Sequence, residues 1–144
     1  MQRDSDSWHS TPVRVRYCEC DPMNVAHHSS FVAWFELART ELLRNRGTSY
    51  ADLERADVLL MVTKMDIRYR SPVAYDDVVE IRVIVDHVGK ARLRHRYEVV
   101  VVESGGEAIV DARLVAEATI ELACCGRDGR PRPLPDEIRP SAGA

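Results

Sequence analysis

The chain has 144 residues, and its 20 Lys and Arg against 23 Asp and Glu give a formal net charge of −3. A chain of this length forms one domain and buries roughly 70% of the surface that its unfolded form exposes, so it can build a core without disulfides or metals. Both charge signs are interspersed, which argues against a nucleic-acid partner, and the longest apolar runs, 58–62 and 99–102, are far shorter than the ~20 residues of a membrane span.

The N-terminal part of the chain predicts a loose segment and then a strand. Residues 1–11 are polar, and Thr11-Pro12 leads into a stretch in which Val13, Val15 and Tyr17 alternate with arginines. Alternation with a period of two is typical of a strand that buries one face. We therefore expect the folded domain to begin at residue 12.

The next apolar segment predicts a long, largely buried helix. Its apolar residues recur at steps of three and four, which is the helical period. They are Phe31, Trp34, Phe35, Ala38 and Leu42, widened by Val32, Leu37 and Leu43. Only a narrow polar strip around Glu36, Thr40 and Arg44 remains. Gly47 is suited to end this helix, and Ser49 is suited to cap a second, short helix near residues 50–56.

From residue 58 onward the hydrophobic period is two. Segments near 63–69, 79–86 and 92–99 alternate apolar and charged residues. The apolar face of a longer last strand is expected to consist of Ala108, Val110, Ala112, Leu114, Ala116, Ala118, Ile120 and Leu122. Gly89 and Gly105-Gly106 supply tight turns, so the last three strands are expected to form an antiparallel meander.

These elements predict an α+β domain at residues 12–125. A five-stranded antiparallel sheet with one apolar face can bury that face, together with the apolar helix, by wrapping around the helix. Residues 126–144 are rich in Pro, Arg and Gly and are expected to form an extended tail.

The loop before the long helix concentrates reactive side chains, namely Cys18, Cys20, Asp21, His27 and His28. A metal site is disfavoured because no C-x-x-C or H-x-x-x-H spacing occurs. A thiol nucleophile needs a base beside a low-pKa thiolate, and no spacing places a histidine there. With the vicinal pair Cys124-Cys125, the four cysteines lack the spacing of a disulfide framework, so we expect reduced thiols.

Asp21 supports a third interpretation of this loop. Asp-Pro pairs start turns, so its role can be limited to accepting backbone N–H groups in a turn. Its position a few residues before the helix adds a chemical role, because free N–H groups from His28 to Phe31 can hold a negatively charged oxygen. A carboxylate beside such donors suits acyl transfer, in which it attacks the substrate or activates water.

The same segment resembles a known family. Residues 17–43, YCECDPMNVAHHSSFVAWFELARTELL, are similar to the pattern Y-x-E-x-D-x-x-G-x-x-x-H-x-x-Y-x-x-W-F-E-x-A-R-T-E-x-L of the 4-hydroxybenzoyl-CoA thioesterase family, which has the hotdog fold. Tyr69-x-x-Pro72-x-x-Tyr75-Asp76-Asp77 and Leu134-Pro135 match further along, so the resemblance extends from residue 12 to about 137. The chain departs from the pattern at Asn24, where the family has Gly, and at His27, where it has Tyr.

The resemblance implies an acyl-CoA thioesterase that hydrolyses a thioester to a free acid and CoA. The family's catalytic aspartate maps onto Asp21, as nucleophile or general base, and the backbone N–H that polarises the carbonyl maps near His28. Asn24 and His27 are then expected at the substrate site. Three basic residues near strand ends, Arg70, Lys90 and Arg92, are candidates for binding the CoA phosphates. We expect no metal and no cofactor apart from the CoA of the substrate.

Two other functions remain open on this fold. One is a hydratase or dehydratase of acyl thioesters, for which we find no His and carboxylate pair, and the other is a non-catalytic acyl-thioester binder. The carrier can be CoA or an acyl carrier protein. Because no apolar signal segment occupies the first dozen residues, we expect a cytoplasmic protein.

The run 58–62 also predicts self-association. It is apolar on both faces, and the long helix can cover only one of them. A second copy of the chain is the simplest cover for the other face, which the family resemblance supports, so we expect a homodimer or homotetramer with active sites at the subunit boundary. The alternative is that the short helix near residues 50–56 folds over this run.

Overall fold

The elements follow the expected order of one strand, a helical segment and four strands. A computed structural model describes residues 7–139. Its elements are β1 (His9–Arg14), α1 (Ser30–Asn45), α2 (Tyr50–Arg55), β2 (Leu59–Tyr69), β3 (Val78–Val88), β4 (Arg92–Ser104) and β5 (Glu107–Cys125), with short 3₁₀ turns at Tyr17–Glu19 and Asp136–Ile138. Gly47 has a φ of +89°, and the Ser49 hydroxyl accepts the Asp52 N–H, so both expected helix boundaries are confirmed.

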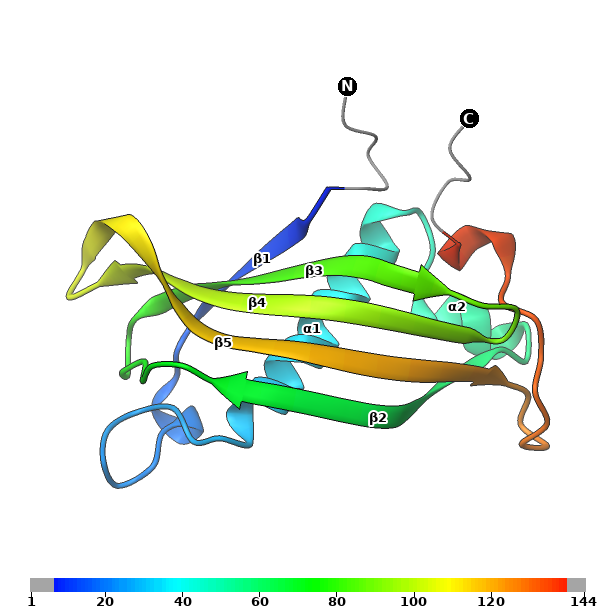
Figure 1. Ribbon diagram of the computed structural model, residues 1–144, viewed down its shortest axis with the longest axis horizontal. Coiled ribbons are helices and arrows are strands. Elements are labelled where there is room, and N and C mark those ends of the chain that lie inside the picture. Colours follow the sequence, from blue (N-terminus) through cyan, green and yellow to red (C-terminus); the bar gives the residue numbers. More distant parts are fainter. Residues whose placement is uncertain (1–6, 140–144) are drawn as a thin grey trace.

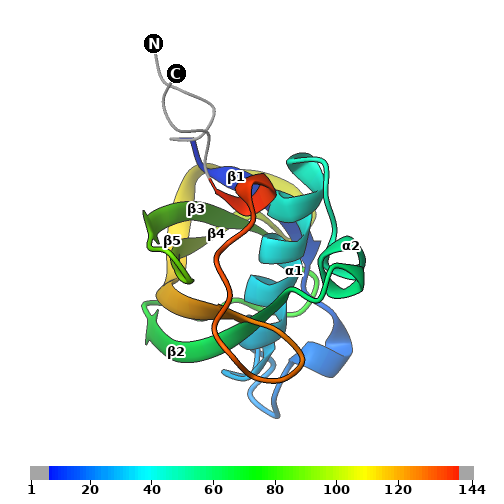
Figure 2. The ribbon, with the colours of Figure 1, turned by 90° about the vertical axis from the view of Figure 1, so that its right-hand side faces the viewer.

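The strands form one antiparallel sheet in the order β1-β3-β4-β5-β2 (Figure 1). The meander of β3, β4 and β5 is confirmed, and β1 and β2 lie at the two edges. Within residues 7–139, β5 is consequently the only strand neighbour of β2. The sheet curves around α1, which lies against one of its faces (Figure 2).

The core lies between α1 and this face of the sheet. On α1 the buried side chains are Phe31, Trp34, Phe35, Ala38, Arg39, Leu42 and Leu43. The α+β class and the sheet wrapped around one long helix are therefore confirmed. The rest of the helix is less covered than expected, because Val32 and Leu37 are 41% and 40% exposed. Among the helices of residues 7–139, none has the length and apolar character needed to cross a membrane.

The expected apolar face of β5 is wrong in its first half. Val110 is 99% exposed, whereas Val115, which was not assigned to that face, is fully buried. The pairing of β4 with β5 shifts register between Val99 and Val100 and again between Val101 and Glu103. Each such irregularity changes which residues face the core. In addition, the β4–β5 hairpin projects beyond α1, so its tip has no core to join (Figure 1).

Both chain ends are more ordered than the composition indicates. Strand β1 begins at His9, three residues before the expected start, and residues 1–6 of the expected loose segment lie outside the described range. The segment after β5 turns back onto the domain instead of extending away, and it buries Leu134 and Ile138 in the core. Residues 140–144 of the expected tail lie outside the described range.

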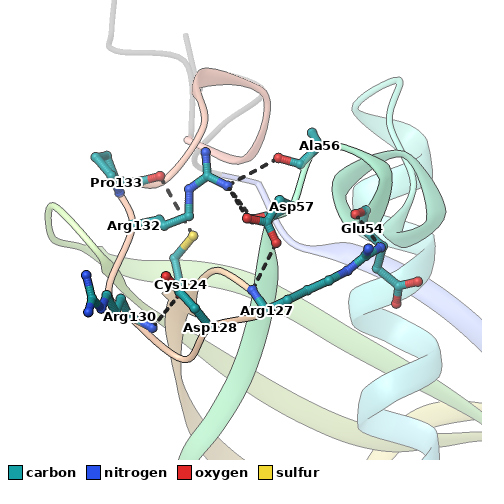
Figure 3. A network of polar contacts seen from close by, with 9 residues as sticks. All are labelled: Glu54, Ala56, Asp57, Cys124, Arg127, Asp128, Arg130, Arg132 and Pro133. Carbon is teal, nitrogen blue, oxygen red and sulfur yellow. Dashed lines mark hydrogen bonds and ion pairs between the residues drawn. The ribbon is translucent and has the colours of Figure 1, made fainter.

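Asp57 holds this returning segment. It ends the α2–β2 turn with a φ of 60°, and its carboxylate accepts the Arg127 backbone N–H at 2.9 Å and the Arg132 guanidinium at 3.1 Å (Figure 3). The Cys124 thiol contacts the Pro133 carbonyl oxygen at 3.7 Å. The C-terminal segment is thus attached to the start of β2 by polar contacts and to the core by apolar ones.

Candidate active site

The loop between β1 and α1 forms a small hairpin with Asp21 at its turn. The Asp21 N–H donates to the Val25 carbonyl at 2.9 Å, and the Asn24 N–H donates back to the Asp21 carbonyl at 2.9 Å. Asn24 has a φ of 63°, in the left-handed region that Asn tolerates better than most residues. This conformation explains how Asn can stand where the family pattern has Gly.

Glu19 ties this hairpin to the long helix. Its side chain is 8% exposed and accepts the Trp34 indole N–H at 2.6 Å and the Arg16 backbone N–H at 2.8 Å. Its carbonyl oxygen accepts the His27 N–H and the Ser30 hydroxyl, each at 2.8 Å. We did not single out Glu19 from the sequence, although it is a matched position of the family pattern. It is a positioning residue that fixes the loop relative to α1.

The Asp21 carboxylate is half-buried and has one oxygen available. Its Oδ1 accepts the Met23 N–H at 2.8 Å, which is the turn-closing role expected of an Asp-Pro pair. Its Oδ2 has no hydrogen-bond donor among residues 7–139. The structural role therefore uses one oxygen and leaves the other for chemistry.

The start of α1 offers fewer free donors than expected. The Ser29 N–H donates to His27 Nδ1 at 3.1 Å, and the Ser30 N–H donates to the His27 carbonyl at 2.9 Å, so neither is free to hold a substrate oxygen. The backbone N–H of His28 has no acceptor in the described part of the chain. The Tyr69 hydroxyl, at the end of β2, donates to the His28 carbonyl at 2.8 Å and holds this peptide in place.

The two histidine rings have different surroundings. His27 Nδ1 also lies 2.7 Å from the Ser29 hydroxyl oxygen, and since it accepts the Ser29 N–H, a neutral His27 carries its proton on Nε2. The His28 ring is exposed and stacks on the His27 ring with a centroid distance of 4.0 Å. The ring of His27 therefore supports the loop, and the backbone of His28 is the part that remains free to bind.

The three basic candidates for CoA binding do not cluster. Arg70 follows β2 at the end of the sheet that carries the Asp21 loop, and its Nε donates to Glu117 at 3.2 Å (Figure 1). Lys90 and Arg92 are exposed at the β3–β4 turn, at the opposite end of the sheet. One chain thus brings together Asp21 with its three loop neighbours Asn24, His27 and His28, has Arg70 at the same end, and leaves Lys90 and Arg92 remote.

The thiols of the loop are poorly suited to catalysis. Cys18 is exposed, and Cys20 is half-buried with its Sγ 3.5 Å from the Arg16 carbonyl oxygen. Burial, together with the nearby charges of Glu19 and Asp21, raises the pKa of the Cys20 thiol, which is the reverse of what a nucleophile needs. Within residues 7–139, no group of three or more His, Cys, Asp or Glu side chains is arranged to hold a metal ion.

Known proteins resemble the chain in sequence and in fold. The family described as the Thioesterase-like superfamily matches residues 15–141. The acyl-CoA thioester hydrolase YbgC of Escherichia coli O6:H1 is 33% identical over 128 residues, which cover 88% of this chain and 90% of YbgC. YneP of Bacillus subtilis is 28% identical over 87 residues, and that match covers 60% of this chain and 63% of YneP.

A solved structure of 4-hydroxybenzoyl CoA thioesterase with 4-hydroxybenzoyl CoA superposes on this fold with a TM-score of 0.79. The match covers 90% of this chain and 94% of that one at 17% identity, so it bears on the fold alone. The chain belongs to the Thioesterase-like superfamily. The hotdog fold and the class predicted from the sequence, a thioester hydrolase, are therefore confirmed.

Proposed function

We propose that the chain hydrolyses acyl-CoA thioesters, with Asp21 as the catalytic carboxylate and the His28 N–H as the oxyanion donor. One observation carries this proposal: a single loop holds a carboxylate oxygen without a donor and a backbone N–H without an acceptor among residues 7–139. Thioester hydrolysis uses both groups. The carboxylate attacks the carbonyl carbon or activates the water that attacks it, and the N–H donates a hydrogen bond to the carbonyl oxygen.

Each group then has a defined step in the mechanism. The His28 N–H, beside the positive end of the α1 dipole, binds the thioester oxygen and stabilises the negative charge that develops on it. Attack on the carbonyl carbon forms the tetrahedral intermediate. Its collapse breaks the carbon–sulfur bond and releases CoA as a thiolate, which then takes up a proton. The buried bonds of Glu19 keep the loop still during these steps.

Two routes differ in what attacks the carbonyl carbon. As a general base, Asp21 takes a proton from water, whose oxygen enters the product acid directly. As a nucleophile, Asp21 forms a mixed anhydride that water then cleaves. A single turnover in ¹⁸O-labelled water is followed by mass measurement of the Asp21 peptide. Label in the carboxylate establishes the nucleophile route, because only water attack on the Asp21 carbonyl of the anhydride places it there, whereas attack on the acyl carbonyl leaves Asp21 unlabelled as the general-base route does.

Replacing Asp21 by Asn tests the proposal. Asn keeps the oxygen that accepts the Met23 N–H, so the turn is retained, but it can neither accept a proton nor attack. The rate of free-thiol release should fall by a factor of ~10² to 10⁴. Asp111→Asn, at an exposed position of the β4–β5 hairpin, is the matched control and should keep wild-type turnover. Near-normal turnover of Asp21→Asn with every substrate that the wild type accepts would refute the assignment.

The alternative functions are tested with the same protein. A hydratase or dehydratase would change the ultraviolet absorbance of an enoyl thioester without releasing thiol, and a binder would retain the thioester unchanged. A panel of short, long and aromatic acyl groups, each on CoA and on acyl carrier protein, identifies the acyl group and the carrier. Of the three basic candidates for CoA, Arg70 follows β2 at the end of the sheet that carries the Asp21 loop, whereas Lys90 and Arg92 lie at the β3–β4 turn and would contact the nucleotide from a neighbouring subunit.

We also propose that the protein is a homodimer or homotetramer. In the described part of the chain, edge strand β2 has no strand neighbour on its outer side, and it exposes Met61 and Val62 by 54% and 47%. Helix α2 packs Leu53 into the core and leaves both side chains uncovered. The outer face of α1 adds the exposed residues Val32 and Leu37. A second copy that covers these side chains would complete the apolar burial and would lie next to the loop end of α1.

Light scattering at micromolar concentration tests this assembly. The wild type should scatter as a dimer or larger, and Met61→Asp should dissociate it and lower its activity in parallel. Val110→Asp is the matched control, because Val110 is exposed on the projecting hairpin and should tolerate the charge. An active wild-type monomer near 16 kDa would contradict the proposal.

Because all four thiols are free, we propose a reducing compartment, the cytoplasm, for the protein.

A further inference from the structure

A small cavity far from the Asp21 loop is lined by three basic side chains and, on its remaining walls, mostly by leucines. It lies between the second half of α1, the start of α2 and the sheet, and the C-terminal Ile138 contributes to its wall. We call it the basic chamber and define it by Arg39, Arg46, Tyr50, His95 and Ile138. Its volume is about 20 Å³. Arg39 is nine residues after Ser30 on α1, about 14 Å along the helix at 1.5 Å per residue, so the chamber is separate from the candidate active site.

Residues 7–139 supply no counter-ion to the two arginines of the chamber. Arg39 is 8% exposed, its Nη1 lies 3.5 Å from the Tyr97 hydroxyl, and its Nε has no hydrogen-bond acceptor within residues 7–139. Arg46 donates from Nη1 to the Ile138 carbonyl at 3.3 Å. Neither arginine has an ion-pair partner among the described residues, and no Asp or Glu lines the chamber.

His95 adds a neutral hydrogen-bonding group to this wall. It is 5% exposed, and its Nδ1 has no partner in the described part of the chain. Burial, together with the charges of Arg39 and Arg46, lowers the pKa of His95 to about 3, so the imidazole is neutral near pH 7. A neutral imidazole has one N–H, which it can donate into the chamber.

These contacts define what the chamber should bind. A buried positive charge is costly unless a negative charge pairs with it, and a buried N–H without an acceptor adds a further cost. One water molecule would satisfy an N–H but would leave the buried charge of Arg39 uncompensated, whereas the charge of the half-buried Arg46 is partly solvated. A polyatomic anion such as phosphate or a substrate carboxylate is too large, because the volume corresponds to little more than a single water-sized sphere.

We propose that the basic chamber binds one monatomic anion, chloride in the cell, through the guanidinium groups of Arg39 and Arg46 and the imidazole N–H of His95. The anion compensates the arginine charges and gives the buried donors an acceptor. It also links α1 to the C-terminal segment, because Arg46 contacts both the chamber and the Ile138 carbonyl. Its role is to stabilise the fold at a place remote from the thioester chemistry.

Bromide provides a direct test, because it replaces chloride and scatters X-rays anomalously. Crystals of the wild-type protein grown or soaked in bromide should show an anomalous peak inside the chamber, in contact with Arg39 and His95. Ordered density without an anomalous signal would mean that the chamber holds water only, and an empty chamber would mean that it holds nothing. Either result overturns the proposal.

Thermal unfolding gives an independent measure in solution. At constant ionic strength, replacing gluconate in the buffer by chloride should raise the Tm of the wild type by about 4 °C when the chloride concentration is tenfold above its Kd. The exposed-site control Arg44→Met should show the same rise, whereas Arg46→Met and Arg39→Met should lose most of it. Equal shifts in all four proteins would assign the effect to general salt action and refute a site. If Arg39→Met does not fold, Arg46→Met and the bromide crystals still decide.

Discussion

Replacement of Glu19 by Gln tests how the active-site loop is held. The Glu19 carboxylate uses its two oxygens for two different hydrogen-bond donors, the Trp34 indole at 2.6 Å and the Arg16 backbone N–H at 2.8 Å, and the oxygen that accepts the Arg16 N–H also pairs with the exposed Arg16 guanidinium at 3.3 Å. Gln has the same shape but only one acceptor oxygen, so its NH₂ group must face one of these donors. One donor, either the buried indole N–H or the part-buried Arg16 N–H, is then left without an acceptor, and the other loses a charged partner.

The expected cost follows from these contacts. A buried donor without an acceptor costs about 1–3 kcal/mol, and exchange of a charged for a neutral acceptor costs about 1 kcal/mol more. The free energy of unfolding should therefore fall by ~2–4 kcal/mol, with a Tm lower by roughly 6–12 °C for a domain of this size. Urea denaturation of the wild type and Glu19→Gln measures the first quantity directly.

A double-mutant cycle with Trp34→Phe isolates the indole bond. Phe removes the donor and keeps an aromatic ring, so Glu19→Gln should cost about 1–2 kcal/mol less in the Trp34→Phe background than in the wild type. Glu36→Gln, an exposed site on the same helix, is the control and should change stability by less than about 0.5 kcal/mol. Additive effects of Glu19→Gln and Trp34→Phe would show that this bond does not hold the loop.

Two further predictions concern the interior beneath the C-terminal segment. The pKa of His95, beside the charges of Arg39 and Arg46, is about 3 in the folded protein, whereas its ordinary value is 6.5. Between these pH values the unfolded chain therefore binds a proton on His95 that the folded chain does not bind. Stability should fall as the pH drops from about 6.5 to 3, by at most ~1.4 kcal/mol per pH unit, and urea titrations of His95→Asn should lack this contribution. Ile138→Ala, at a side chain 3% exposed, should lower the free energy of unfolding by about 2–4 kcal/mol, whereas Ile109→Ala on the hairpin should cost less than half as much.

Local patterns were sufficient to predict the elements of the fold. The helical period around Trp34 and the period of two in β2, β3 and β4 can be read from residues that are neighbours in sequence. In each segment the apolar residues repeat at the period of the element because the element buries one face. The turn at Asp21 was predictable for the same reason, because the Asp-Pro pair and the following helix start are local signals. The family pattern then assigned the chemistry of this loop.

Features that depend on distant contacts were not predictable in this way. The register shifts that expose Val110 arise where β4 meets β5, and no sequence period reports them. Arg39 lies beside Ala38 on an apolar helix, and only packing against the strand that carries His95 shows that it is buried. The Pro- and Arg-rich composition of the C-terminal segment hid its two core anchors, Leu134 and Ile138.

The position of β2 at the sheet edge also sets the order in which the chain can fold during synthesis. Among the described strands its backbone pairs with β5 alone, whose residues are made about 50 positions later, so β2 must wait while β3 and β4 form their own hairpin. Long-range pairing of this kind is slow, and unpaired apolar strands are prone to aggregate in the interval. If synthesis ends before residue 107, the released chain therefore contains an apolar β2 segment that has no partner strand.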